Sequence, residues 1–392
     1  MRFPAILSLF ASLVLSAGMA TPLFAAEPIT VNDLAAMVAS SHGTSDGRLA
    51  KQLYERKLTE RLSTVRLSVL SVEAPGDESR KALLALADAS AFLDLPAAEI
   101  PATAPMAEEA QKQLLQKSID YLKREIPLLP DFMATQRLIQ FSDVPAKARK
   151  DHDNKPYDEK LHEVQELSAT VRFLGGKEEV AARPVRDKGT APAAQRLLVQ
   201  GVFGPIFSVV LKDVLVANPS LDLSRSNLSF SHWESEQGGA MAVFRFQVPR
   251  ERSHYIVQDS EAQEELSPFA AYHGEIGLDP ATGAILRLML VADRPPKSPV
   301  ARADILVEYG PQNLGGKSYI CPRKSVAVSL ARDVSPMEGL YTYPLSMVPP
   351  FKLELNDTAY TEYHLFRTEM RVLTGDGDGE SGTTAPPPKP QR

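Results

Sequence analysis

The chain has 392 residues, of which 44% are hydrophobic and 23% charged, and its formal net charge is −6. This is the composition of a globular protein with enough apolar residues for a sizeable core. Because the net charge is negative and no long run of basic residues occurs, the sequence has no cluster of positive charge that could bind the phosphates of nucleic acid. We therefore exclude nucleic acid as a partner. The single cysteine, Cys321, excludes a disulfide within the chain and is expected to be a buried thiol.

The first 26 residues have the three parts of a secretory signal peptide. Arg2 supplies the positive charge, residues 5–19 form an apolar stretch, and small residues follow. We expect cleavage after Ala25 or Ala26, and therefore an exported protein that works in the periplasm or outside the cell. The alternative is an uncleaved anchor, since the apolar stretch is almost long enough to span a bilayer. No second run of 18 apolar residues occurs, so no further transmembrane span is predicted.

Residues 27–130 are predicted to form a helical region. Thr30 is placed to cap a first helix, and a second, long helix is predicted from Asp46. Two more helices follow, one closed by Pro96 and one ended by Pro127. Amphipathic helices of this kind need a partner surface for their apolar stripes. The apolar stripe of the second helix consists of Leu58, Leu62, Val65 and Val69.

Between residues 131 and 374 the apolar period changes to two, which predicts a β-sheet domain. Turn signals at 279–283 and 315–316 give short connections, and these imply antiparallel pairing. Residues 205–217 form a helix that is apolar nearly all round and is expected to lie buried across the sheet. The tail 375–392 is predicted to be disordered. The predicted strands are 133–141, 168–173, 228–234, 240–248, 254–258, 272–278, 285–291, 303–309, 318–330 and 358–373.

These elements predict an α+β fold. A helical layer at the N-terminus is followed by a curved, mainly antiparallel sheet, open like half a barrel, with one apolar helix across it. The serial hairpins and that helix are similar to the half-barrels of periplasmic lipoprotein carriers. This similarity implies an apolar concavity for an acyl chain or a lipidated partner, and it is a likeness of architecture alone.

Six short stretches of the sequence are distinctive when they are taken together. They are 58–63, 86–93, 231–234, 272–276, 319–322 and 363–367. Together they resemble a family of uncharacterised exported bacterial proteins, over roughly residues 45–374. This resemblance implies export and a bacterial origin, but it implies no activity.

Two pairs of histidine and glutamate form the first candidate site. His273 and Glu275 lie two residues apart on one predicted strand, and Glu362 and His364 do so on another, so each pair shares a face. If the strands are neighbours, the four side chains converge in a set that binds a transition metal or places a base beside an acid. The alternative is the solvated polar face of an antiparallel sheet.

An apolar ligand groove is the second candidate site. The helix 205–217 contributes Phe207 and Leu211, and Trp233, the only tryptophan, stands on a predicted strand. Trp233 and its neighbour His232 are expected to point to opposite faces of that strand. Trp233 is then either a core anchor whose N–H is bonded to a carbonyl, or a stacking surface for a ligand.

The sequence contains no familiar catalytic or nucleotide-binding motif and identifies no cofactor. The leading hypothesis is therefore an exported cell-envelope protein that is not an enzyme and binds an apolar ligand, a lipid, or a lipidated or other protein partner. The first alternative is a metal-dependent or acid–base hydrolytic enzyme that uses the histidines and glutamates of the sheet. The second alternative is a structural scaffold with neither groove nor cluster.

Overall fold

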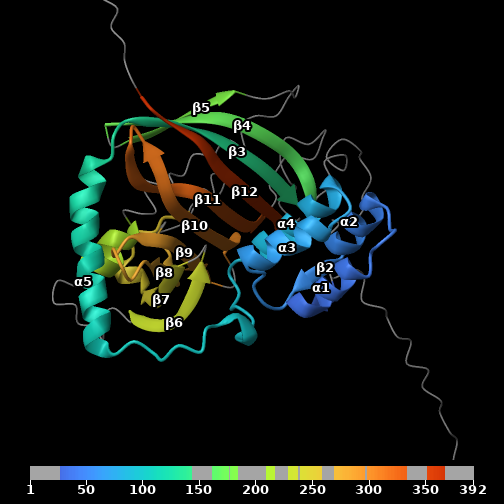
Figure 1. Ribbon diagram of the computed structural model, residues 1–392, viewed down its shortest axis with the longest axis horizontal. Helices are drawn as coiled ribbons and strands as arrows, with labels where there is room; N and C mark the ends of the chain where they lie inside the picture. Colours follow the sequence, from blue (N-terminus) through green and yellow to red (C-terminus); the bar gives the residue numbers. More distant parts are fainter. Residues whose placement is uncertain are drawn as a thin grey trace, which may run out of the picture.

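The structure is a computed structural model, and it has the α+β fold that the sequence predicts. Helices precede a large antiparallel sheet that is not closed into a barrel (Figure 1). The predicted signal segment 1–26, the tail 375–392 and Phe207 lie outside the residues that the structure describes. The described residues are 27–143, 161–175, 177–183, 209–216, 228–236, 239–257, 269–295, 298–332 and 351–366.

The described residues form five α-helices. The first begins as predicted, because Thr30 Oγ1 accepts a hydrogen bond from the Asp33 N–H while Asp33 Oδ2 accepts one from the Thr30 N–H. Within the described chain, no helix combines the length and the apolar character that crossing a membrane requires. The helices are α1 (Val31–Ala39), α2 (Asp46–Tyr54), α3 (Thr64–Glu73), α4 (Asp77–Ala89) and α5 (Glu108–Glu125), and the short turns η1 (Ala97–Glu99), η2 (Ile126–Leu128) and η4 (Arg250–Arg252) are 3₁₀ helices.

The prediction of one long helix from Asp46 is correct only as far as Tyr54. α2 ends at Tyr54, the strand β2 (Arg56–Leu58) follows, and Ser63 caps a separate helix, α3. β2 pairs in parallel with β1 (Glu27–Ile29), and no local period reveals a pairing between segments so far apart in the chain. The predicted apolar stripe is therefore split, with its two leucines buried and its two valines exposed on α3.

The large sheet has ten strands in the described chain, and all neighbours in it are antiparallel. In space their order is β5-β4-β3-β12-β11-β10-β9-β8-β7-β6, so the strands from β6 to β12 follow their sequence order and β12 then pairs with β3. The strands are β3 (Phe132–Ser142), β4 (His162–Leu174), β5 (Lys177–Arg183), β6 (Ser229–Glu236), β7 (Gly239–Val248), β8 (Ala271–Leu278), β9 (Ile285–Asp293), β10 (Val300–Leu314), β11 (Lys317–Arg332) and β12 (Phe351–Leu365).

The predicted turns and most predicted strands are confirmed. Gly315 and Gly316 have φ angles of 64° and 89° between β10 and β11, a conformation that glycine adopts without strain. The strand predicted at 254–258 is wrong, since Ile256 forms only an isolated bridge with Phe269. The strand β5 is missing from the prediction.

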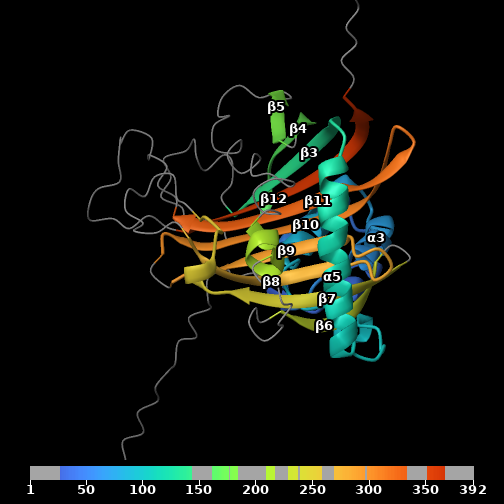
Figure 2. The same ribbon diagram turned by 90° about the vertical axis from the view of Figure 1, so that its left-hand side faces the viewer.

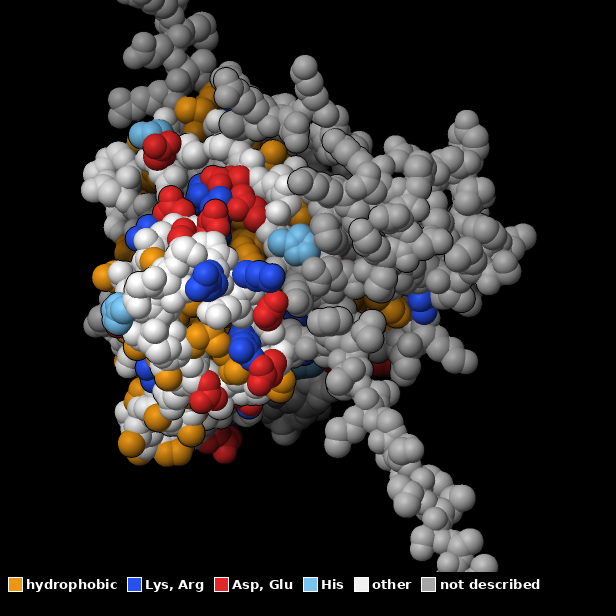
Figure 3. Space-filling model, turned by 90° about the vertical axis from the view of Figure 1, so that its right-hand side faces the viewer, with side chains coloured by type: hydrophobic (Ala, Val, Ile, Leu, Met, Phe, Trp, Pro, Cys, Tyr) orange, Lys and Arg blue, Asp and Glu red, His pale blue; other side chains and the backbone are white. Residues whose placement is uncertain are grey.

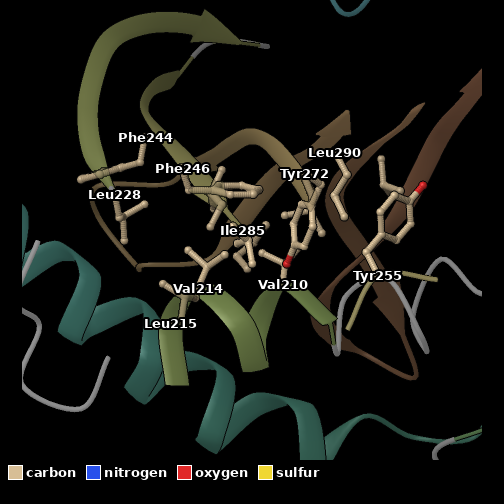
Figure 4. Packing of buried hydrophobic residues seen from close by; sticks show 14 of the residues in the cluster. Val210, Val214, Leu215, Leu228, Phe244, Phe246, Tyr255, Tyr272, Ile285 and Leu290 are labelled. Atoms are coloured by element: carbon tan, nitrogen blue, oxygen red, sulfur yellow. The ribbon is translucent and has the colours of Figure 1, made fainter. Parts of the chain in front are cut away.

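One face of the sheet, which we call the core face, packs against α5 and the helical segment 209–216. Figure 2 shows α5 running across the strands. In the segment, residues Leu211–Val216 form a π-helical turn, η3. Val210, Val214 and Leu215 are each 1% exposed, and in Figure 4 they point toward side chains from the strands such as Phe244. The apolar side of this segment is therefore used in core packing.

The opposite face, which we call the cap face, carries the four helices α1–α4, which we call the helical cap. In Figure 1 the cap and α5 lie on opposite sides of the sheet. Ala85 and Ala91 of the cap pack on Met289, Leu306 and Val326 of three neighbouring strands. A second apolar cluster holds the cap helices together. The cap thus has a core of its own and a second apolar contact with the sheet.

Cys321 is the buried thiol that the sequence predicts. Its side chain is fully buried on β11, in an apolar cluster with Phe132, Phe173 and Leu314. Burial raises the pKa of the thiol to about 12. Because the thiolate is the nucleophile, this cysteine is inert near neutral pH.

Candidate binding cleft

The two predicted His–Glu pairs lie on strands that are not neighbours. His273 and Glu275 stand on β8 and Glu362 and His364 on β12, and β9, β10 and β11 lie between them. With neighbouring strands about 4.8 Å apart, four steps across the sheet separate the pairs by roughly 19 Å, far more than one metal ion bridges. The convergence that the metal hypothesis requires is therefore absent. Among all described residues, no group of three or more His, Cys, Asp or Glu is arranged to hold a metal.

Each pair has other contacts. His273 Nδ1 lies 2.8 Å from Asp293 Oδ1, and Thr135 Oγ1 donates to Glu362 Oε2 at 2.7 Å. Glu362 has a positive φ of 51°, at the point where the register between β12 and β3 shifts. Glu275 alone of the four is buried in a charged network, which is described below.

The described part of the predicted apolar groove consists of partly buried side chains that pack against the apolar core. Trp233 Nε1 donates to the Ala104 carbonyl at 3.0 Å, and its ring centroid lies 5.3 Å from that of Phe230, as expected of a core anchor. Leu211 packs against the same apolar cluster on the core face. His232 lies on the opposite face from Trp233, because its Nε2 is 2.9 Å from Glu234 Oε1 in the charged network.

A cleft of about 560 Å³ lies between the helical cap and the cap face of the sheet. This volume is in the range of small-molecule sites. One wall is α3 with the loop before it, a second wall is the end of α4 and the chain after it, and the floor comes from β6, β9, β10 and β11. Seen from the side of the cap, the surface carries acidic and basic side chains with hydrophobic ones between them (Figure 3). The aliphatic walls are formed by Leu62, Leu67, Ala91, Leu95, Leu306 and Val326.

A buried network of arginines and glutamates forms one part of the floor. Arg287 on β9 donates to both carboxylate oxygens of Glu234 on β6, at 2.6 and 2.8 Å, and to Glu275 on β8 at 3.2 Å. Arg61, from the loop before α3, also pairs with Glu234, and these four side chains are at most 8% exposed. At the edge of the network, Arg245 pairs with both Glu275 and Asp94. The network therefore joins the cap to four neighbouring strands of the sheet, β6 to β9.

The ionisation of Glu234 depends on these partners. Burial by itself would raise its pKa. Hydrogen bonds from Arg287 and His232, together with the charges of Arg287 and Arg61, instead hold the pKa of Glu234 well below its ordinary value. Glu234 is thus a carboxylate in the folded protein, and its charge is compensated.

A second buried cluster consists of Lys324 on β11, Asp88 on α4 and Asp357 on β12. Lys324 Nζ lies 2.5 Å from Asp88 Oδ1 and 3.0 Å from Asp357 Oδ2. The second carboxylate oxygen of Asp88, Oδ2, is buried and has no hydrogen-bond partner among the described residues. Burial, and the neighbouring Asp357 carboxyl, raise the pKa of Asp88 well above its ordinary value, although the Lys324 ammonium opposes this. We assign the proton to Asp88.

Replacing Asp88 with asparagine should change how stability depends on pH. The pKa of Asp88 is higher in the folded than in the unfolded chain, so its protonation stabilises the fold below the ordinary aspartate pKa of about 3.9, and this contribution is lost as the pH rises through the folded pKa. The asparagine does not titrate. Urea unfolding from about pH 4 to pH 8 should therefore show the wild type losing free energy of unfolding relative to Asp88→Asn.

The exposed Asp120 on α5 provides the matched control. Asp120→Asn makes the same chemical change outside the cleft, and its stability curve should run parallel to that of the wild type. Parallel curves for Asp88→Asn as well would contradict a protonated Asp88.

Sequence reasoning missed these charged residues, although two signals for them exist. Arg61, Asp88, Glu234 and Glu275 all fall in the six stretches that carry the family resemblance. Arg287 is a charged residue within a largely apolar strand, and a charge buried there requires a partner of opposite charge. Neither signal identifies the partner, because the partners come from distant parts of the chain.

Comparisons with protein-family models and with curated proteins give no match for this chain. The resemblance to a family of exported bacterial proteins therefore stays a prediction, and so does the likeness to lipoprotein carriers. What the chain offers as a functional site is the geometry of the cleft.

Proposed function

We propose that this protein is an exported binding protein without catalytic activity, and that it holds a small amphiphilic molecule in the cleft between the helical cap and the sheet. The observation that carries the proposal is a cleft of about 560 Å³ that combines aliphatic walls with a charged floor. A molecule with an apolar body and a polar head group, such as a lipid or a lipidated segment of an envelope protein, matches both surfaces.

The floor supports binding because its side chains are already held in place. Arg287 and Glu234 are fixed by hydrogen bonds to each other, and Lys324 is fixed by two carboxyls. A ligand then meets a surface that needs little ordering, which reduces the entropic cost of binding. The same buried groups have partners of opposite charge within the protein, so the empty cleft is stable as well.

The proposed ligand site lies on the cap face of the sheet, whereas the carrier hypothesis places the ligand on the core face. In the carrier hypothesis the apolar concavity lies beneath the helix 205–217, but the described part of that helix is packed against the sheet. The open antiparallel sheet, which we take to be curved like half a barrel, agrees with a carrier only at the level of architecture. Export itself is proposed from the signal-like segment 1–26.

A tryptophan at the cleft wall tests the proposal. Ser68 is exposed on α3 and lines the cleft, whereas Val72 on the same helix is 85% exposed and does not. Native mass spectrometry would compare wild type, Ser68→Trp and Val72→Trp after export and purification without denaturant. We expect wild type and Val72→Trp to retain a small molecule that denaturation releases, and Ser68→Trp to lose most of it. A bare wild type, or equal retention by all three proteins, would contradict the proposal.

A further inference from the structure

The charges on the cleft floor balance except for Glu308. Glu308 on β10 lies directly opposite Arg287 on β9 and Lys324 on β11, so the three side chains form one row across the cap face. Glu308 acts on Lys324 through its charge, but it makes no hydrogen bond and no ion pair within 4 Å among the described residues. Both of its basic neighbours are held by other carboxyl groups, Arg287 by two glutamates and Lys324 by two aspartates.

The formal charges of the described groups around the cleft, with Asp88 protonated, sum to −1. In the first network, three arginines face three carboxylates, and in the second cluster the charge of Lys324 faces that of Asp357 while Asp88 carries the proton. At the rim, Arg66 pairs with Glu99 at 3.0 Å. Among these described groups, Glu308 is the carboxylate without a close ion pair, because the nearby Lys324, whose pKa its charge helps to raise, is bound to the two aspartates. The three facing arginines are Arg61, Arg245 and Arg287, and their carboxylates are Glu234, Glu275 and Asp94.

We infer that the ligand of the cleft is a protonated aliphatic amine, whose ammonium group pairs with Glu308 and whose hydrocarbon body lies against Leu67 and Val326. The inference rests on the proposed function, since it names the class of molecule that the cleft binds. An anionic head group is disfavoured, because it would face Glu308 and would have to displace Glu234 to reach the arginines.

The lining of the cleft also selects among cations. None of the described residues that line it is aromatic. Quaternary ammonium groups are recognised through aromatic rings, whereas a primary ammonium donates hydrogen bonds to a carboxylate. The cleft therefore fits a primary amine better than a choline-like group.

Three probes of equal chain length test this inference by isothermal titration calorimetry on the mature protein at neutral pH. They are octylammonium, octanoate and octyltrimethylammonium. We expect octylammonium to bind most tightly, and Glu308→Gln to weaken its affinity at least tenfold, because a charge-assisted hydrogen bond is lost. Glu73→Gln is the matched control, since Glu73 is exposed on α3 and does not line the cleft. That variant should bind octylammonium as the wild type does.

The outcomes separate this inference from the proposed function. Unchanged octylammonium binding in Glu308→Gln, or tighter binding of octanoate, would overturn the amine assignment. If Ser68→Trp still blocks the probe that binds, the cleft remains the ligand site. If Ser68→Trp binds every probe like the wild type, or if the wild type binds none, both the site and the assignment are overturned.

Discussion

Replacing Glu234 with alanine should lower the free energy of unfolding by about 3–5 kcal/mol, because the change leaves two buried arginines with Glu275 as their one remaining carboxylate. Arg61 and Arg287 are at most 8% exposed, so water does not replace the lost partner. Urea unfolding followed by far-UV circular dichroism measures the loss. Since the network joins the cap to the sheet, we also expect the cleft to lose its shape in this variant.

The pH dependence of the same network gives a second readout. The folded pKa of Glu234 lies below its unfolded value, so its contribution is present at neutral pH and is lost as the pH falls through the folded pKa. The difference between wild type and Glu234→Gln should therefore shrink in strong acid. Glu73→Gln, an exposed change of the same kind, should stay within about 0.5 kcal/mol of the wild type. A loss below about 1 kcal/mol for Glu234→Ala would show that the network is not structural.

Truncating Phe244 to alanine should cost about 3–5 kcal/mol through the loss of buried surface and the cavity left behind. Phe244 is fully buried on the core face, its ring centroid lies 5.8 Å from that of Phe230, and the segment with Val214 packs over it (Figure 4). The exposed Val72→Ala is the control and should be nearly neutral. A cost below about 1 kcal/mol for Phe244→Ala would indicate an open groove beneath this segment, and would return the ligand to the core face.

The sequence by itself determined the elements whose causes are local. The capping box at Thr30, the glycine turn at 315–316 and the period of two after residue 131 act through neighbouring residues, so their patterns predict the observed structure. The burial of Cys321 also followed from residue chemistry alone, whereas for Trp233 the sequence left a core role and a ligand-stacking role open. The α+β class follows from the sum of these local elements.

Only the tertiary structure decided where the candidate site lies. Two His–Glu pairs with the same local spacing are separated because three strands lie between β8 and β12, and no local pattern specifies the order of strands. Glu234 meets Arg61 across 173 residues of chain, and Lys324 meets Asp88 across 236. Periodicity and turn chemistry extend over a few residues, whereas these ion pairs exist because the cap docks on one face of the finished sheet.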